Sequence, residues 1–251
     1  MATYDVQDRS AIVTGAGSGI GRAVARLLAA NGAAVVVHDL DAAAADRVTA
    51  EIVADGGVAS AFVGDAADPE VAVRAVAAAE ELAPLRIAVN NAGVGGPSVP
   101  VGDYPLDAWR TVVDVNLSGV FYNLRAQLPA MAAHGGGAIV NMGSVLGSVG
   151  LPGSSAYVTT KHGLVGLTKN AALEYGDQQV RVTAVGPGFI STPLLEANLD
   201  ADAQAALGAK HAAGRLGTSE EVAALVAFLV SDAATFVTGS YHLVDGGYAA
   251  S

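Results

Sequence analysis

Tyr157 and Lys161 are the two residues whose types and spacing point most directly to chemistry. Because they are four positions apart, they would lie one turn above each other on the same face of a helix. A phenol has a reference pKa of about 10, and each unit of lowering takes about 1.36 kcal/mol of differential charge interaction. To act near neutral pH, Tyr157 would need about 4 kcal/mol of help, more than one exposed ammonium gives. The alternative is an ordinary helical pair of a core tyrosine and a lysine whose stem is buried.

A glycine-rich run lies near the start of the chain, between an apolar segment at residues 10–14 and a segment with helical periodicity. From residue 14 to residue 21 it reads T-G-x-x-x-G-x-G, which departs from G-x-G-x-x-G because Ile20 takes the place of a glycine. Glycines in this place let backbone N–H groups approach a pyrophosphate at the positive end of a helix. The run therefore predicts a dinucleotide site, and the alternative is a tight glycine turn without a ligand.

Asp39 ends the second apolar run, eighteen residues after Gly21. A carboxylate there can accept hydrogen bonds from both hydroxyls of an adenosine ribose. A 2′-phosphate in the same place would meet like charge, at a cost of up to about 4 kcal/mol at a separation of about 4 Å. We therefore predict NAD(H) rather than NADP(H), with Arg22 as the one nearby cation that could complicate this. The alternative is that Asp39 caps the next helix, which Asp41 could do itself.

The composition provides enough apolar residues for a large core. The chain has 251 residues, 52% hydrophobic and 15% charged, without a composition break, so we expect one domain spanning residues 1–251. The net charge of −11 argues against binding to nucleic acid or to an anionic membrane. There is no cysteine, the first nine residues do not read as a signal peptide, and the longest apolar run, residues 222–230, is too short to cross a bilayer. These features predict a cytoplasmic protein.

Short apolar runs alternate with segments of helical periodicity along the whole chain. Runs that are apolar throughout are typical of strands buried on both faces of a parallel sheet. We therefore predict an α/β fold of the Rossmann-like, doubly wound type, with a seven-stranded parallel sheet and helices on both faces. Strands are expected at residues 10–14, 33–37, 59–63, 87–89, 138–142, 180–185 and 241–244, and long helices at 107–133 and 156–175.

A series of motifs, in order from one end of the chain to the other, resembles the short-chain dehydrogenase/reductase family: residues 14–21, Asp39, Asn90-Asn91-Ala92-Gly93, Asn116, Ser144, Tyr157-x-x-x-Lys161, Pro187-Gly188 with Thr192, and Val244-Asp245-Gly246-Gly247. The resemblance implies that Tyr157 is the general acid in ketone reduction and the general base in alcohol oxidation. It implies that Lys161 binds the nicotinamide ribose and lowers the Tyr157 pKa, aided by the positive charge of the oxidised nicotinamide. Ser144 would donate to the substrate oxygen, and the backbone of Asn116 would hold a water that links Lys161 to solvent. Standing alone, Ser144 would be a loop hydroxyl and Asn116 a polar group inside a helix.

The resemblance also implies a set of cofactor contacts, with NAD(H) as the cofactor. Asp65 and Ala66 would meet the adenine, and the turn from Asn91 to Gly93 would lie under the adenosine ribose. The expected contacts are Gly15, Ser18, Gly19, Ile20, Gly21, Asp39, Asp65, Ala66, Asn91, Ala92, Gly93, Tyr157, Lys161, Pro187, Gly188, Ile190 and Thr192.

The substrate end of the site is expected to be apolar. We interpret residues 189–217, which are rich in loop-forming residues, as a lid. The pocket wall is predicted to consist of Val94, Ser144, Leu146, Gly153, Phe189, Leu194 and Leu195. No arginine converges there, which disfavours phosphorylated or carboxylate substrates. A small uncharged ketone, alkyl or aryl, and its secondary alcohol are therefore predicted, and the overall match is similar to bacterial secondary-alcohol dehydrogenases.

Two other functions stay open. A 3-oxoacyl-[acyl-carrier-protein] reductase is a common relative within the family, but it usually takes NADPH, which Asp39 opposes. It also needs a basic docking face, whereas Leu173 stands where an arginine would be expected. A non-catalytic binding protein on the same fold would commonly lack one of Ser144, Tyr157 and Lys161.

The helices predicted at 107–133 and 156–175 carry apolar residues on more than one face, which indicates a second covering layer. The family pairs these helices across a dyad and adds an interface at the last strand, so the resemblance implies a homotetramer. The five histidines, at positions 38, 134, 162, 211 and 242, show no i,i+4 pair and no glutamate-containing metal motif, so we interpret them as structural or surface residues and expect no catalytic metal.

Overall fold

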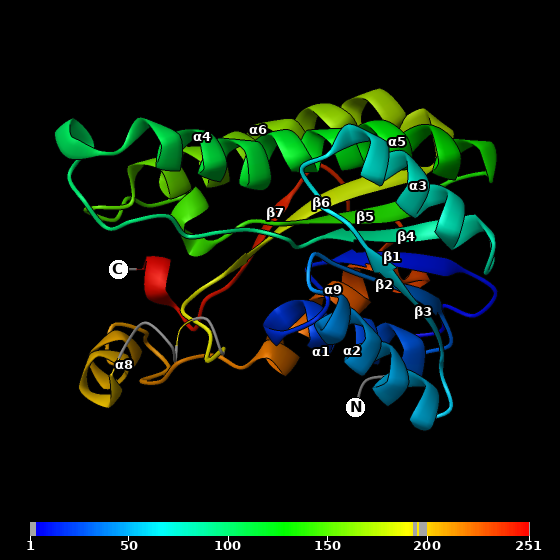
Figure 1. The fold of residues 1–251 in the computed structure, drawn as a ribbon, viewed down its shortest axis with the longest axis horizontal. Helices are drawn as coiled ribbons and strands as arrows, with labels where there is room; N and C mark the ends of the chain where they lie inside the picture. The colour runs from blue at the N-terminus through cyan, green and yellow to red at the C-terminus, as the bar shows by residue number, and fades with distance from the viewer. Residues whose placement is uncertain (1–3, 193–194, 196–199, 251) are drawn as a thin grey trace.

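A parallel sheet organises the molecule in the computed structural model, which describes residues 4–192, 195 and 200–250. Its strands are β1 (Ser10–Thr14), β2 (Ala34–Asp39), β3 (Val58–Val63), β4 (Leu85–Asn90), β5 (Gly137–Met142), β6 (Val180–Pro187) and β7 (Tyr241–Val244). They lie in the order β3-β2-β1-β4-β5-β6-β7, and every neighbouring pair is parallel. The strand order switches between β1 and β4, which is where ligands of doubly wound sheets bind. The predicted seven-stranded Rossmann-like sheet is confirmed (Figure 1).

Helices cover both faces of the sheet, as Figure 1 shows. One layer consists of α1 (Gly19–Ala30), α2 (Ala42–Ala54) and α9 (Ser219–Val230), and the other of α3 (Pro69–Glu80), α4 (Leu106–Val113), α5 (Gly119–Ala133) and α6 (Ser155–Tyr175). Helix α8 (Ala201–Gly208) belongs to neither layer and lies beyond the carboxyl ends of the strands, within the segment interpreted as a lid. The last short turn, Tyr248–Ala250, returns to the same end of the sheet (Figure 1).

Two hydrophobic cores lie on opposite faces of the sheet. Val13 and Val37 belong to the core shared with α1, α2 and α9, whereas Ile12 and Val36 belong to the core shared with α3, α5 and α6. All four side chains are fully buried. Burying each of them contributes about 1.5–3 kcal/mol relative to exposure. Because both faces are covered, these strands read as unbroken apolar runs in the sequence.

The helix that the sequence predicts at residues 107–133 is a continuous helical segment that contains a π-helical turn. Helix α4 leads into a π-helical turn, Asp114–Ser118, which leads into α5. A π-helical turn closes i→i+5 hydrogen bonds, and such turns are frequent at functional sites. Asn116 lies in the middle of this turn and is fully buried.

A polar network crosses the core between β4, β5, α5 and α6. The Asn90 side chain donates to Gln127 Oε1 at 3.1 Å and to Asn141 Oδ1 at 2.9 Å, and Gln127 donates back to Asn90 Oδ1 at 2.9 Å. Asn141 in turn donates to Thr168 Oγ1 at 3.0 Å. All four residues are at most 2% exposed, and a satisfied network of this kind fixes one arrangement of the elements it joins.

Candidate active site

A cavity of about 960 Å³ lies at the carboxyl ends of the strands and brings most of the predicted site residues together. The predicted residues in its lining are Gly15, Ser18, Gly19, Ile20, Asp39, Asp65, Ala66, Asn91, Ala92, Gly93, Val94, Ser144, Leu146, Tyr157, Lys161, Pro187, Gly188, Phe189, Ile190 and Thr192. Gly21, Asn116 and Leu195 do not line this cavity, and Leu194 lies outside the described residues. Gly153 does not line it either, and its carbonyl accepts a hydrogen bond from Val99 N–H at 3.1 Å in a neighbouring loop.

The glycine loop joins β1 to α1 in a backbone path that larger residues would obstruct. Gly15 has a φ of +63° and Gly19 a φ of +51°, in the left-handed region that favours glycine. A Cβ on Gly21 would collide with the carbonyl oxygen of Gly15. A Cβ on Gly17 would lie 2.6 Å from the Cβ of Ala44, so this position also has no room. The loop can therefore bring backbone N–H groups close to a ligand at the N-terminus of α1.

Asn91 supports this loop from the end of β4. Thr14 Oγ1 accepts hydrogen bonds from the N–H groups of Asn91 and Ala92 at 2.9 and 3.0 Å. The Asn91 side chain donates to the carbonyl oxygens of Thr14 and Gly15 at 2.9 and 3.2 Å. These reciprocal bonds fix β4 against β1 at the point where the two strands end.

Asp39 faces the glycine loop and does not cap a helix. Its Oδ2 accepts from Gly17 N–H at 2.8 Å, and its Oδ1 accepts from Asp41 N–H at 3.0 Å. The cap of α2 is Asp41, whose Oδ1 accepts from the N–H groups of Ala43 and Ala44. Asp41 thus performs the capping role that was the alternative for Asp39.

Two arginines near the glycine loop differ in their partners: Arg22 pairs with a carboxylate, and Arg47 contacts the backbone of the loop. Arg22, which the sequence marks as a complication, pairs with Glu51 at 2.8 Å and does not line the cavity. Arg47, which sequence reasoning did not consider, donates from Nη2 to the carbonyl oxygen of Gly17 at 3.1 Å. No sequence motif marks Arg47, because it lies in the second turn of α2, thirty residues from its partner.

The loop after β3 forms the far end of the cavity. Asp65 Oδ1 accepts from Ala67 N–H at 2.9 Å, and the Ala66 carbonyl accepts from the Asn123 side chain at 2.9 Å. His38, which we predict only as structural or surface, is buried and lines the cavity here. Its Nε2 lies 3.1 Å from the Gly64 carbonyl, and burial lowers its pKa. His38 therefore enters the site as a neutral imidazole.

Lys161 is a buried ammonium next to the Tyr157 ring. Lys161 is 3% exposed, and its Nζ donates to the Met142 carbonyl at 2.8 Å. The same Nζ lies 5.3 Å from the centroid of the Tyr157 ring, in cation–π range. Burial lowers the pKa of Lys161 to about 8. Helix α6 therefore places both groups at the site with the four-residue spacing that the sequence predicts.

Burial acts on the Tyr157 phenol in the direction opposite to the effect predicted for Lys161 and the nicotinamide. Burial raises its pKa above the ordinary value, and a hydrogen bond with the Ser144 side chain offsets only part of that rise. The physical reason for this rise is that loss of solvent penalises the phenolate more than the neighbouring protein groups stabilise it. The lowering of the Tyr157 pKa by Lys161 together with the oxidised nicotinamide stays a prediction.

Ser144 is held by contacts on both sides. Its Oγ accepts from Leu146 N–H at 3.2 Å and caps the short helix Val145–Gly147. Its carbonyl accepts a hydrogen bond from the hydroxyl of Tyr241 on β7. Burial raises the pKa of Tyr241 to about 12, so this phenol is a donor at neutral pH. Sequence reasoning missed Tyr241, since only the sheet order brings the last strand beside the Ser144 loop.

Asn116 joins the π-helical turn to the loop after β4. Its Oδ1 accepts from Val94 N–H and its Nδ2 donates to the Val94 carbonyl, both at 2.8 Å. A Cβ added to Gly93 would lie 3.1 Å from Asn116 Oδ1 and 3.8 Å from Lys161 Nζ, so the three residues are neighbours. The side chain of Asn116 is thus committed to the loop, and the water held by its backbone stays a prediction.

His211 joins the substrate end of the cavity to the lid segment. Its Nδ1 lies 2.9 Å from the Leu207 carbonyl in α8, and its Nε2 accepts from Phe189 N–H at 3.2 Å. The ring also packs against Phe189 and against Tyr248 of the C-terminal turn, with centroids 5.9 and 5.2 Å apart. Sequence reasoning treats His211 as structural or surface, and the structure shows that it is a buried link between three segments of the site wall.

In the parts of the chain that the structure describes, no group of three or more His, Cys, Asp and Glu side chains is placed to hold a metal ion. No helix among those same residues is both long and apolar enough for a bilayer crossing. That the reaction needs no metal stays a prediction.

Comparisons with known proteins agree along the length of the chain. A family model described as enoyl-(acyl carrier protein) reductase matches residues 15–249. Cyclohexanol dehydrogenase of Acinetobacter sp. (strain SE19) is 48% identical over 242 residues, which are 96% of this chain and 95% of that protein. Cis-4-hydroxycyclohexanecarboxylate dehydrogenase of Sinomonas cyclohexanicum is 46% identical over 245 residues, 97% of both proteins.

A solved structure adds a match in three dimensions. A protein of Beutenbergia cavernae, described as an NAD(P)-dependent gluconate 5-dehydrogenase with NADP bound at low occupancy, aligns with a TM-score of 0.92 and 38% sequence identity over 100% of both chains. Sequence, fold and the grouping of Ser144, Tyr157 and Lys161 in one cavity lead to the same assignment. This chain is a member of the short-chain dehydrogenase/reductase family.

Proposed function

We propose that this chain is an NAD(H)-dependent dehydrogenase that interconverts small uncharged secondary alcohols, cyclic ones in particular, and their ketones. The observation that carries the proposal is the convergence of Ser144, Tyr157 and Lys161 on a cavity that the glycine loop also lines. A hydroxyl, a phenol and an ammonium grouped in this way can hold a carbonyl oxygen and supply it with a proton.

The adenosine end of the cavity fits a nicotinamide dinucleotide. The glycine loop leads directly into α1, and the space around Gly17 and Gly21 would be filled by any larger side chain. Asp39, at the end of β2, can accept hydrogen bonds from ribose hydroxyls. When bound, the nicotinamide would supply or accept the hydride. These features support NAD(H) as the cofactor.

The chain's own residues account for the proton. Because burial raises the pKa of Tyr157, this phenol is protonated at neutral pH and can donate to a ketone oxygen. The Ser144 hydroxyl, which is hydrogen-bonded to the phenol, can donate to the same oxygen as negative charge develops on it. For alcohol oxidation Tyr157 must first lose its proton, and the Lys161 ammonium beside its ring favours the phenolate.

The substrate end of the cavity supports an uncharged alcohol. Val94, Leu146 and Phe189 line it, and Lys161 is the sole lysine or arginine among the described lining residues. Lys161 donates to the Met142 carbonyl and lies beside the Tyr157 ring, so it is placed to act on the phenol and not on a substrate carboxylate. Two relatives, cyclohexanol dehydrogenase and cis-4-hydroxycyclohexanecarboxylate dehydrogenase, are named for substrates with a six-membered ring, so a cyclic alcohol is the first substrate to test.

A substrate panel tests this proposal. Oxidation of cyclohexanol with NAD⁺ is measured beside 2-butanol, 1-phenylethanol and cis-4-hydroxycyclohexanecarboxylate, and reduction of acetoacetyl thioesters is measured with NADH and NADPH. We expect the highest kcat/KM with cyclohexanol and a lower value for the carboxylate. Faster reduction of acetoacetyl thioesters with NADPH would instead support the acyl-carrier-protein reductase alternative.

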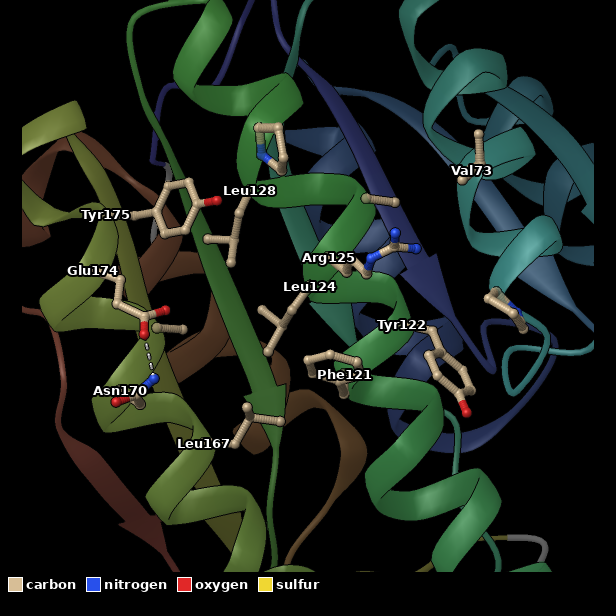
Figure 2. A pocket seen from close by; sticks show the side chains of 14 residues that line it. Val73, Phe121, Tyr122, Leu124, Arg125, Leu128, Leu167, Asn170, Glu174 and Tyr175 are labelled. Carbon is tan, nitrogen blue, oxygen red and sulfur yellow. Dashed lines mark hydrogen bonds between the residues drawn. The ribbon is translucent and has the colours of Figure 1, made fainter.

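We also propose that the chain assembles as a homotetramer. A groove of about 690 Å³ lies between α3, α5 and α6, and Figure 2 shows Leu128 of α5 with Leu167 and Tyr175 of α6 along it. On the same surface Phe121 is 48% exposed and Val73 is 57% exposed. An apolar surface on packed helices is stabilised by a second layer, and a second copy of this chain would supply one.

The edge strand β7 supports a second contact. Leu243 is 41% exposed there, and Phe236, just before the strand, is fully exposed. Sedimentation equilibrium tests the assembly, with a Phe121→Glu variant to weaken the helical surface. A mass near that of one 24.8 kDa chain for the unchanged protein would exclude the tetramer.

A further inference from the structure

Gly17 of the glycine loop lies between a carboxylate and a guanidinium. Its N–H donates to Asp39 Oδ2 at 2.8 Å, and its carbonyl accepts from Arg47 Nη2 at 3.1 Å. Gly17 is buried, and a Cβ there would lie 2.8 Å from Asp39 Oδ2. The two charged side chains therefore reach the same point of the loop from β2 and from α2.

Arg47 differs from the other arginines of this surface in having no acidic partner. Arg22 pairs with Glu51 at 2.8 Å, and Arg26 pairs with Asp55 at 2.7 Å. Within residues 4–192, 195 and 200–250, no ion pair involves Arg47. Although the chain has a net charge of −11, the Arg47 guanidinium next to the glycine loop is not paired with a carboxylate of the described residues.

The position of Arg47 suits a phosphate more than the carbonyl it now contacts. Asp39 is placed to meet the ribose hydroxyls, so a 2′-phosphate on that ribose would extend toward the part of the loop that Arg47 contacts. A guanidinium can bind a phosphate through two parallel hydrogen bonds between oppositely charged groups, whereas its present bond is a single one to the uncharged Gly17 carbonyl. The Arg47 residue is also exposed, so its side chain can turn from Gly17 to such a group.

We propose that Arg47 is a residue able to recognise the 2′-phosphate of NADP(H), and that Asp39, which selects NAD(H) in the proposed function, is what keeps Arg47 from making this contact. This inference rests on the proposed function, because it takes the cavity as the dinucleotide site. The preference for NAD(H) over NADP(H) then depends on the Asp39 carboxylate, while the Arg47 guanidinium is already placed to bind a 2′-phosphate. Removal of the Asp39 carboxylate is therefore sufficient to admit NADP(H).

The test compares binding to Asp39→Ser, to Asp39→Ser with Arg47→Met, and to Asp39→Ser with Arg22→Met as the matched arginine control. Calorimetric titration gives dissociation constants for NADPH and NADH, and for 2′,5′-ADP and 5′-ADP as probes without a nicotinamide. Each variant is judged by its ratio of NADPH to NADH affinity, because a general disturbance of the loop affects both cofactors and leaves the ratio unchanged.

We expect Asp39→Ser to raise the ratio of NADPH to NADH affinity at least about tenfold. In that background, Arg47→Met should reverse most of the gain, whereas Arg22→Met should leave the raised ratio unchanged. The same order is expected for 2′,5′-ADP over 5′-ADP. A double variant with Arg47→Met that retains the full gain overturns the role of Arg47. If the unchanged protein already prefers NADPH, the proposed NAD(H) dependence fails, and the Arg47 comparison still reports separately on the phosphate contact.

Discussion

Replacing Lys161 with Met should change how the stability of the protein depends on pH. Burial lowers the pKa of the Lys161 ammonium to about 8 in the folded chain, from the ordinary value of 10.5. Between these two values the unfolded chain holds more protons than the folded chain, so the free energy of unfolding rises with pH. Below both values the two states are protonated, and the folded chain bears the full cost of a buried charge.

The linkage relation gives the size of the effect. With these two pKa values, the free energy of unfolding should rise by about 2 kcal/mol between about pH 7.5 and about pH 9.5 from this one group. The window ends below about pH 10 because Tyr157 and Tyr241 act in the opposite direction above it. Their pKa values are raised in the folded chain, so their contribution to stability is lost as the unfolded phenols ionise.

Urea unfolding of the cofactor-free protein at several pH values measures this dependence. All samples are compared at one protein concentration, because subunit association also contributes to stability. Lys169→Met, an exposed lysine on the same helix, is the matched control and should retain the rise. If Lys161→Met shows the same rise as the unchanged protein, the pH dependence comes from other groups and our account of the buried ammonium is wrong.

Three further substitutions test individual contacts of the site. Tyr157→Phe should reduce turnover to less than about a tenth while NADH binding stays nearly intact, because the lost hydroxyl acts on the proton; a steady-state assay with a binding titration decides this. Tyr241→Phe removes the donor to the Ser144 carbonyl and should lower kcat several-fold with little change in cofactor affinity; an altered affinity with normal kcat would contradict the positioning role. Gly21→Ala places a methyl group against the Gly15 carbonyl and should weaken NADH binding by more than about tenfold; unchanged binding by calorimetry would show that the loop can yield.

The site residues that follow the carboxyl ends of strands could be found from sequence. The glycine loop, Asp39, Asn91 and Ser144 each come directly after an apolar run, and a parallel sheet brings all such ends to one edge. Tyr157 and Lys161 are different, because helical spacing places them on one face of a helix, whereas the family resemblance is what assigns them to catalysis. These positions depend on where strands and helices begin and end along the chain, which hydrophobic periodicity predicts well.

The contacts that sequence could not supply join segments far apart in the chain. Arg47 reaches Gly17, Tyr241 reaches Ser144, and His211 reaches Phe189, each across a distance set by packing and not by spacing. The direction of the Tyr157 pKa shift also depends on burial, which a neighbour pattern does not contain. The π-helical turn, Asp114–Ser118, lies inside the helix predicted at residues 107–133, and a single turn is too short for periodicity to separate i→i+5 from i→i+4 hydrogen bonds.

The polar network of Asn90, Gln127, Asn141 and Thr168 constrains how this sequence can change over time. Each amide side chain both donates to and accepts from another member of the network. An apolar replacement at one position therefore leaves a buried donor or acceptor of its partner without a hydrogen bond. Such a step costs about 1–3 kcal/mol, while exchange of several members together for matching hydrocarbon shapes can be nearly neutral. Homologous sequences should therefore retain all four residues or replace several of them together. Because Asn90 ends β4 and Asn141 lies in β5, the network also fixes the relative positions of the loops that follow these two strands.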